Sequence, residues 1–194
     1  MDTALPTSPL EAGVSIAQAS PWHSAAVTLQ SPALEVMTDL TLVKAATTQP
    51  STSLRQAEQL MIYQGVRMLF VVTDMPSLEG LVTSTDLRGD AQMRAVHERQ
   101  ARYDDLCVAD VMTGLANLEA IDFGRLQAAR VGHLVATLQR HGRHHLLVVE
   151  AASAETPRRV RGVISRSQIE RQLGHSIEVP PIASSFSEIE RALF

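Results

Sequence analysis

The chain has 194 residues, of which 45% are hydrophobic and 20% charged, and its net charge at pH 7 is −4. This is the composition of an ordinary globular protein, without the basic runs that bind nucleic acid or anchor a chain to a membrane. A single cysteine, Cys107, excludes a disulfide within the chain and fits a reducing compartment. No apolar stretch has the length of a membrane span, and the N-terminus does not resemble a signal peptide. We therefore expect a cytoplasmic protein that binds neither nucleic acid nor membrane.

Residues 1–30 are rich in Ala, Ser, Thr and Pro and have no regular period, which predicts a mobile or loosely docked arm. Residues 31–87 then form the first of two similar units. Its first helix is expected over residues 54–64, where apolar side chains recur at helical spacing. Ser53 is a fitting N-cap for this helix, and Gly65 stands where a C-cap glycine belongs.

Three strands are expected around this helix. Residues 45–48 can supply an edge strand, and the β-rich runs at 69–72 and 80–83 are typical of a hairpin. A second helix is expected to begin near Asp86, capped by one of the two hydroxyl residues before it. Residues 88–107 follow as a polar and partly helical connector.

Residues 108–173 repeat this pattern. The counterparts occur in the same order: Val111-Met112-Thr113 for Val36-Met37-Thr38, His141-Gly142 for Gln64-Gly65, Leu146 to Val149 for Leu69 to Val72, and Gly162 to Ile169 for Gly80 to Leu87. Ser167 can cap the second helix of this copy. The spacing between counterparts grows along the chain, and the last increase falls in residues 151–161, where a hairpin loop would lie. Because insertions in surface loops cost little, this drift is compatible with a true repeat.

The tail, residues 174–194, has a different character. Pro180 and Pro181 break the chain, and a short amphipathic helix is expected after them. We expect that helix to pack on the body of the protein or on a partner subunit.

One such unit has three short strands and two helices, too little to bury its own apolar surface. Two units packed against each other can do so. The sequence therefore predicts an α+β (mixed α/β) fold of two tandem βαββα repeats, packed back to back with pseudo-twofold symmetry.

These motifs resemble a CBS-domain pair, named after cystathionine β-synthase. The Val-Met-Thr opening, the Leu-x-x-Ala helix and the Gly-hydrophobic-x-Thr/Ser-x-x-Asp exit carry the resemblance, which covers roughly residues 34–173. The chain looks like the stand-alone bacterial type, without an attached enzyme or transporter.

The resemblance implies a regulatory function. Such pairs bind adenosine-containing ligands, typically AMP, ADP, ATP or S-adenosylmethionine, in clefts between the two units. They usually form homodimers and signal to a partner protein or fused domain. We therefore expect a non-enzymatic sensor with no obligatory cofactor and an unidentified protein partner. The alternative is a structural adaptor dimer whose ligand sites have degenerated.

The exit motif of each copy supplies candidate ligand residues. The resemblance implies that Thr83 and Asp86 contact the nucleotide, and a carboxylate can accept hydrogen bonds from both ribose hydroxyls. In the second copy Ser165 is retained, but Gln168 stands where the aspartate belongs. A neutral amide holds a ribose less well, so we expect unequal sites, with the Asp86 site the tighter. The alternative is that Thr83 and Asp86 only cap a helix.

Basic residues precede the middle strand of each hairpin. The resemblance implies that Arg67 in the first copy, and Arg143, His144 and His145 in the second, reach ligand phosphates. A histidine near neutral pH can gain a proton when a phosphate arrives. The alternative is a solvated basic turn.

Metal binding and catalysis have weaker support. His133 and His141 lie about two helical turns apart, too far to share one ion easily, and no cysteine lies near them. Cys107 precedes an apolar segment without a catalytic partner at a recognisable spacing, so we interpret it as a packing residue.

Overall fold

The computed structural model describes residues 9, 25–100, 102–153 and 157–178. It contains two four-stranded mixed sheets. The first has the order β2-β3-β4-β5, and its strands are β2 (Thr47–Thr48), β3 (Met68–Val71), β4 (Gly80–Thr83) and β5 (Thr113–Gly114). The second has the order β1-β8-β7-β6, and its strands are β1 (Met37–Asp39), β8 (Arg159–Ser165), β7 (His145–Glu150) and β6 (Ala120–Asp122).

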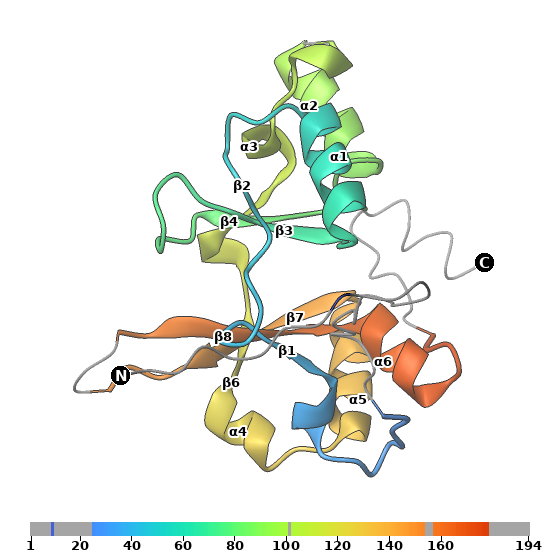
Figure 1. Ribbon diagram of the computed structural model, residues 1–194. Coiled ribbons are helices and arrows are strands. Elements are labelled where there is room, and N and C mark those ends of the chain that lie inside the picture. Colours follow the sequence, from blue (N-terminus) through green and yellow to red (C-terminus); the bar gives the residue numbers. More distant parts are fainter. Residues whose placement is uncertain (1–8, 10–24, 101, 154–156, 179–194) are drawn as a thin grey trace.

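Helices cover the outer faces of the two sheets, and the inner faces meet across a seam (Figure 1). The α-helices are α1 (Leu54–Gln64), α2 (Asp90–Arg99), α3 (Val108–Val111), α4 (Phe123–Gln127), α5 (Val131–His141) and α6 (Arg166–Leu173). Short 3-10 helices are η1 (Ala33–Val36), η2 (Tyr103–Asp105) and η3 (Leu115–Asn117). The predicted α+β fold of two units packed back to back is confirmed.

The two halves repeat the same hairpin. In the first half β3 pairs antiparallel with β4, with Met68 opposite Thr83, and β2 lies parallel to β3. In the second half β7 pairs with β8, with His145 opposite Ser165, and β6 lies parallel to β7. Met68 and His145 are therefore counterparts, as are Thr83 and Ser165. Both predicted hairpins are confirmed, and the strand predicted at residues 45–48 is present only at Thr47–Thr48, as β2.

The helix ends also follow the sequence. Ser53 caps α1 by accepting a hydrogen bond from the backbone N–H of Gln56, and the Gln56 side chain accepts from the N–H of Ser53. Gly65 and Gly142 end α1 and α5 in the left-handed conformation, with φ of 65° and 56°. Only glycine adopts this conformation at little cost, which explains both positions.

The halves exchange their first strands. The Val36-Met37-Thr38 segment precedes the first unit in sequence, but β1 pairs with β8 of the second, and Asp39 forms an ion pair with Arg161. In the same way β5, which carries Thr113, pairs with β4 of the first unit. Each sheet is therefore completed by the strand that opens the other repeat.

This exchange depends on one glycine in each half. A Cβ atom at Gly162 would lie 2.6 Å from Sδ of Met37, and one at Gly80 would lie 2.6 Å from the carbonyl oxygen of Thr113. The glycine of one exit motif thus contacts the opening strand of the other repeat. This contact gives a physical reason for the pairing of these two motifs.

The second helix of the first half begins later than predicted. Residues 84–88 form turns, and α2 begins at Asp90. The carboxylate of Asp86 accepts hydrogen bonds from the N–H and the hydroxyl of Thr83, which stabilises a turn in place of a helix. In the second half α6 begins at Arg166, directly after β8. Ser167, the predicted cap, lies inside its first turn.

The apolar core has three parts. One cluster lies between the first sheet and its helices, and a second lies between the second sheet and its helices. The third fills the centre of the seam and takes side chains from both sheets: Met68, Phe70, Leu81, Leu147 and Val163. Burial of these side chains holds the two halves together.

The segments that flank the repeats are only partly described. At the end of the predicted arm, Val27 is buried and its N–H donates to the carbonyl of Gln172. Ile177 in the tail is buried against the same half. The rest of the arm and the predicted helix of the tail lie outside the described residues. Among the described helices, none has both the length and the apolarity that crossing a membrane requires.

Candidate functional site

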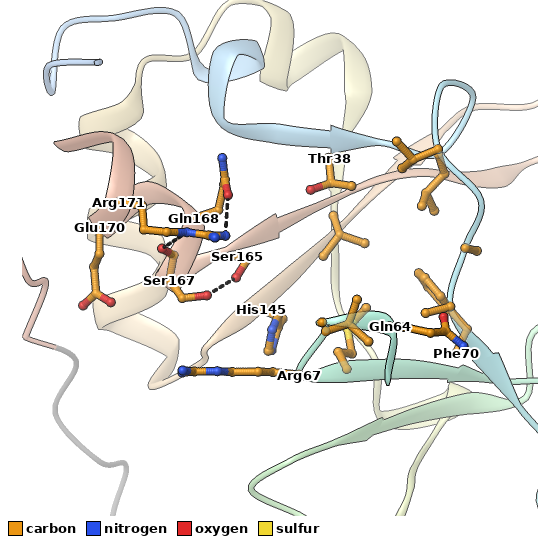
Figure 2. A pocket seen from close by; sticks show the side chains of 18 of the residues that line it. Thr38, Gln64, Arg67, Phe70, His145, Ser165, Ser167, Gln168, Glu170 and Arg171 are labelled. Atoms are coloured by element: carbon orange, nitrogen blue, oxygen red, sulfur yellow. Dashed lines mark hydrogen bonds between the residues drawn. The ribbon is translucent and has the colours of Figure 1, made fainter. Parts of the chain in front are cut away.

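A cleft of about 900 Å³ opens at one end of the seam between the two halves (Figure 2). One wall comes from the loop between β1 and β2 and includes Leu40, Lys44 and Ala45. The start of α6 forms the opposite side. The volume falls within the range of small-molecule and cofactor sites in proteins.

The floor of the cleft is apolar. Met68 and Phe70 of β3 and Val163 of β8 line it, and all three belong to the seam cluster. They present a surface on which a flat, uncharged ring can be buried. Contributions from both sheets make the cleft sensitive to how the halves are arranged.

The second-half exit motif forms the polar side. The hydroxyls of Ser165 and Ser167 lie 3.0 Å apart. Gln168 is buried; its amide nitrogen donates to Oε1 of Gln172 at 3.1 Å, and its oxygen accepts from Arg171 at 2.7 Å. The first turn of α6 lies beside these side chains, and the positive end of the helix dipole favours an anion there.

A smaller pocket of about 240 Å³ adjoins the cleft. The two share Arg67, His145, Ser165, Ser167 and Glu170. The smaller pocket also contains several pairs of counterparts from the two halves: Arg67 with His144, Ser84 with Arg166, and Thr85 with Ser167. It therefore lies at the approximate twofold axis that relates the repeats.

His145 is held in its neutral form. Burial, together with the charges of His144 and Arg67, lowers the pKa of His145 from 6.5 to about 4. Its Nδ1 is buried and has no hydrogen-bond partner within the described part of the chain. A buried polar atom without a partner is unfavourable, and a ligand group that supplied the missing bond would relieve that cost.

The acidic group of the cleft is already engaged. Burial raises the pKa of Glu170, but hydrogen bonds from the N–H of Ile177 and from Arg166, with the charge of Arg166, outweigh it and lower the pKa overall. Glu170 is the only carboxylate in the described lining of the cleft. Arg67 forms no side-chain hydrogen bond or ion pair with any described residue. The cleft is therefore suited to an anionic ligand.

The structure brings most of the predicted ligand residues together. Arg67, His145, Ser165 and Gln168 line the cleft (Figure 2). His144 lines the adjoining pocket.

Thr83 and Asp86 line neither cavity, and their side chains are bonded to each other at 2.7 Å. The greater affinity predicted for the Asp86 site stays a prediction. Arg143, which the resemblance implied to reach ligand phosphates together with His144 and His145, also lines neither cavity.

Sequence reasoning missed Arg171 and Lys44. Arg171 lies three residues after Gln168 on the same helix, so its place on that face was available from helical spacing. Lys44 lies in an irregular loop, for which no periodic signal exists.

The other candidate groups have structural contacts. Nδ1 of His133 accepts a hydrogen bond from the N–H of Arg130. Nδ1 of His141 lies 3.3 Å from Oε2 of Glu119. The thiol of Cys107 lies 3.4 Å from Asp110 at the start of α3. Within the described residues, no group of three or more His, Cys, Asp or Glu side chains is placed to hold a metal ion.

Comparison with known proteins identifies the class of this fold. The sequence model of the CBS domain family matches residues 33–90. Similar solved structures include an uncharacterized conserved protein from Pyrococcus horikoshii, which is 22% identical with a TM-score of 0.54, over 79% of this chain and 100% of that one. The CBS-domain containing protein ATU1752 from Agrobacterium tumefaciens is 16% identical with a TM-score of 0.51, over 74% of this chain and 93% of that one.

A third similar structure contains a ligand. It is CBSX2, a CBS-pair protein of Arabidopsis thaliana, in complex with AMP. It is 20% identical with a TM-score of 0.50, over 73% of this chain and 94% of that one. No curated protein sequence matches this chain significantly. Residues 33–90 are thus a CBS domain, and the chain has the fold of a CBS-domain pair.

Proposed function

We propose that the cleft binds an adenosine-containing nucleotide, such as AMP, ADP, ATP or S-adenosylmethionine, and that binding regulates a partner protein. The observation that carries this proposal is the composition of the cleft. An apolar floor of Met68, Phe70 and Val163 lies beside a polar end with Arg67 and two serines. A nucleotide has the same division into a flat base and an anionic phosphate.

The two cavities suggest how the ligand lies. The base packs on the apolar floor of the cleft. The phosphate points into the smaller pocket, where the Arg67 guanidinium and the N–H groups at the start of α6 donate hydrogen bonds. His144 and His145 lie in the same pocket, so the phosphate meets groups from both halves.

The solved structure of CBSX2 with AMP supports this choice of ligand class. It shows that a protein with this fold can hold an adenine nucleotide. The two sequences share only 20% identity, so for the present chain the main support for this ligand class is the lining of the cleft.

Regulation follows from the position of the site. Both halves line the cleft, so a ligand that prefers one arrangement of the halves shifts the molecule toward it. A partner protein that contacts both halves would bind the two arrangements with different affinity and so respond to the ligand. We propose a cytoplasmic homodimer as the regulatory unit, without catalytic activity of its own.

The binding experiment uses the full chain and four ligands: AMP, ADP, ATP and S-adenosylmethionine. A ligand at a hundred times its Kd should stabilise the fold by about 2.7 kcal/mol, which a thermal shift detects. Calorimetry then gives Kd. Absence of any shift with all four ligands would overturn the proposal.

Arg67→Ala tests the phosphate contact. It should weaken binding of AMP by roughly ten- to a hundredfold, the range for losing a hydrogen bond to a charged group. The matched control is Arg94→Ala, which removes an exposed arginine of α2 that lines neither cavity. Equal affinity of the two variants for AMP would show that Arg67 does not contact the phosphate.

A structural adaptor is the second candidate. It is favoured by Gln168, which replaces the carboxylate of the exit motif, and by Asp86, whose carboxylate is bonded to its own turn. An adaptor would form the same dimer and bind its partner equally well with and without nucleotide. The thermal-shift screen separates the two functions, because an adaptor with degenerate sites shows no shift.

A further inference from the structure

The side of the cleft formed by the second-half exit motif, where the ribose of the proposed nucleotide would lie, carries a positive charge. In the first half the exit motif ends in the carboxylate of Asp86, a pure acceptor. At the same place in the second half stands Gln168, and its only acceptor oxygen receives a hydrogen bond from Arg171 at 2.7 Å. Ribose hydroxyls donate hydrogen bonds and need acceptors. The side chains here offer a cationic donor instead.

Arg171 is held in place while keeping free donors. Its Nε donates to the carbonyl of Ser167 at 3.3 Å, and one terminal nitrogen donates to Gln168. A guanidinium has five N–H groups, so three remain after these two bonds. No carboxylate pairs with Arg171 in the described part of the chain, and the neighbouring Glu170 is bonded to Arg166 and Ile177.

The cleft therefore has two separate cationic positions. Arg67 enters from the start of β3, and Arg171 comes from α6 on the other half (Figure 2). Lys44 adds to the cationic lining, against Glu170 as the one carboxylate in the described lining of the cleft. A nucleoside monophosphate bound through Arg67 leaves Arg171 without an anionic partner.

We propose that the cleft selects nucleotides that carry a second phosphate on the ribose, at the 2′ or 3′ position, and that Arg171 binds that phosphate. This inference rests on the proposed nucleotide site and specifies its ligand class. A guanidinium binds phosphate with paired hydrogen bonds, whereas it offers a neutral ribose hydroxyl no acceptor. Gln168 acts as a positioning residue that holds the Arg171 guanidinium toward the cleft.

The test compares ligands that differ in where the second phosphate lies. Adenosine 3′,5′-bisphosphate and adenosine 2′,5′-bisphosphate are titrated by calorimetry beside AMP and ADP. ADP is the control for the number of phosphates, because both of its phosphates are at the 5′ end. We expect one of the two bisphosphates to bind at least about tenfold more tightly than ADP. The bisphosphate that binds more tightly identifies the ribose position.

Arg171→Gln measures the contribution of the guanidinium. The readout is the ratio of the Kd for AMP to the Kd for the preferred bisphosphate, which should fall to near one. The matched control is Arg140→Gln, which removes an exposed basic residue of α5 that lines neither cavity, and it should keep the ratio. A thermal unfolding curve of each variant confirms that it is folded.

Gln168→Asp provides the reverse test. A carboxylate at this position accepts from the ribose hydroxyls and repels a ribose phosphate, so the preference should change toward AMP. If AMP binds but neither bisphosphate binds more tightly than ADP, the inference is wrong and the nucleotide site remains. If no nucleotide binds, the proposed function itself is wrong.

Discussion

The turn after β4 and the first helical turn of α6 after β8 occupy equivalent places in the two halves but use their side chains differently. In the first, the side chain of Asp86 points toward Thr83. Its Oδ2 accepts hydrogen bonds from the N–H of Thr83 at 2.8 Å and from the Thr83 hydroxyl at 2.7 Å. In the second, Ser165 bonds to Ser167, and Gln168 turns along α6 toward Arg171. One turn satisfies its own polar groups, and the other leaves serine and guanidinium donors facing a cleft.

The loops that approach these turns also differ. Residues 40–46, between β1 and β2, supply a wall of the cleft, including Leu40 and Lys44. The equivalent residues 115–119 are fewer, and their first part is the 3-10 helix η3. The comparison shows that an acidic residue in the exit motif does not by itself create a pocket. The pocket also needs a loop from the other repeat that stands away from the turn.

The largest expected effect concerns the exchanged strands. Gly80→Ala places a Cβ 2.6 Å from the carbonyl oxygen of Thr113, a backbone atom that cannot move alone. We expect the free energy of unfolding to fall by about 3 kcal/mol. Gly162→Ala should cost less, about 2 kcal/mol, because the nearest atoms belong to the flexible side chain of Met37 and the nearest backbone atom, the carbonyl oxygen of Thr38, lies farther away at 2.9 Å. Denaturant unfolding measures both values.

Gly114→Ala is the control for these variants. It lies in β5, and a Cβ there meets nothing within 4 Å. A Gly80→Ala protein as stable as Gly114→Ala would contradict the strand exchange. Gly162 and Gly80 also differ in the strand that each contacts. Gly162 contacts β1, which carries Thr38 of the cleft lining, whereas Gly80 contacts β5, which lines neither cavity. Gly162→Ala should therefore weaken nucleotide binding more than Gly80→Ala does.

The next effect is the pH dependence of stability, which His145 should cause and its counterpart Met68, which does not titrate, cannot. The folded protein keeps His145 neutral down to a pH of about 4, whereas the unfolded chain binds a proton near pH 6.5. Titration of His145 should therefore lower the free energy of unfolding by about 2–3 kcal/mol as the pH drops through this window, and the loss due to His145 is complete below it. His145→Met, which copies the first half, should remove this part of the acid dependence.

Unfolding by urea at several pH values between 7 and 4 measures the slope. His97→Met is the control, since His97 is an exposed residue of α2. It should keep the slope of the natural sequence. If His145→Met and His97→Met show the same slope, another group causes the acid dependence.

The repeat and its helix ends could be predicted because they depend on local rules. Capping by Ser53, the left-handed glycines and the alternation of helix and strand follow from residue type and spacing alone. The exchange of β1 and β5 could not be predicted, because Met37 and Met112 stand at the same place in each repeat whichever sheet they join. The residue pattern of a single sequence does not indicate whether an opening strand joins the sheet of its own repeat or that of the other.

The site was predictable in part, through the resemblance to a CBS-domain pair. That resemblance implied Arg67, His145, Ser165 and Gln168 as ligand residues, and the cleft contains all four. The inward bonding of Asp86 was not predicted, because a carboxylate three residues after a threonine fits both a ligand contact and a closed turn. The choice between them depends on backbone geometry after β4, where residues 84–88 form turns before α2 begins.

A smaller effect tests that closed turn. Asp86→Ala removes the acceptor of two Thr83 hydrogen bonds and should lower the free energy of unfolding by about 1 kcal/mol. Asp86→Asn, which keeps one acceptor oxygen, should lose about half as much. Denaturant unfolding measures both. A nucleotide titration of Asp86→Ala that loses all binding would instead establish this turn as the tighter site, as the sequence predicted.

An effect of about the same size concerns positions where the halves are alike. Gly65 and Gly142 end α1 and α5 with φ of 65° and 56°, and alanine at either position should cost about 1 kcal/mol, since its Cβ strains the left-handed backbone. Asparagine tolerates this conformation better and should cost less at both. Equal losses in denaturant unfolding would show that the repeats share one backbone, so that their different binding arises from side chains and loop length. A clear inequality would instead mean that the repeats differ already in their backbone, and the contrast between Asp86 and Gln168 would then be a consequence of that difference.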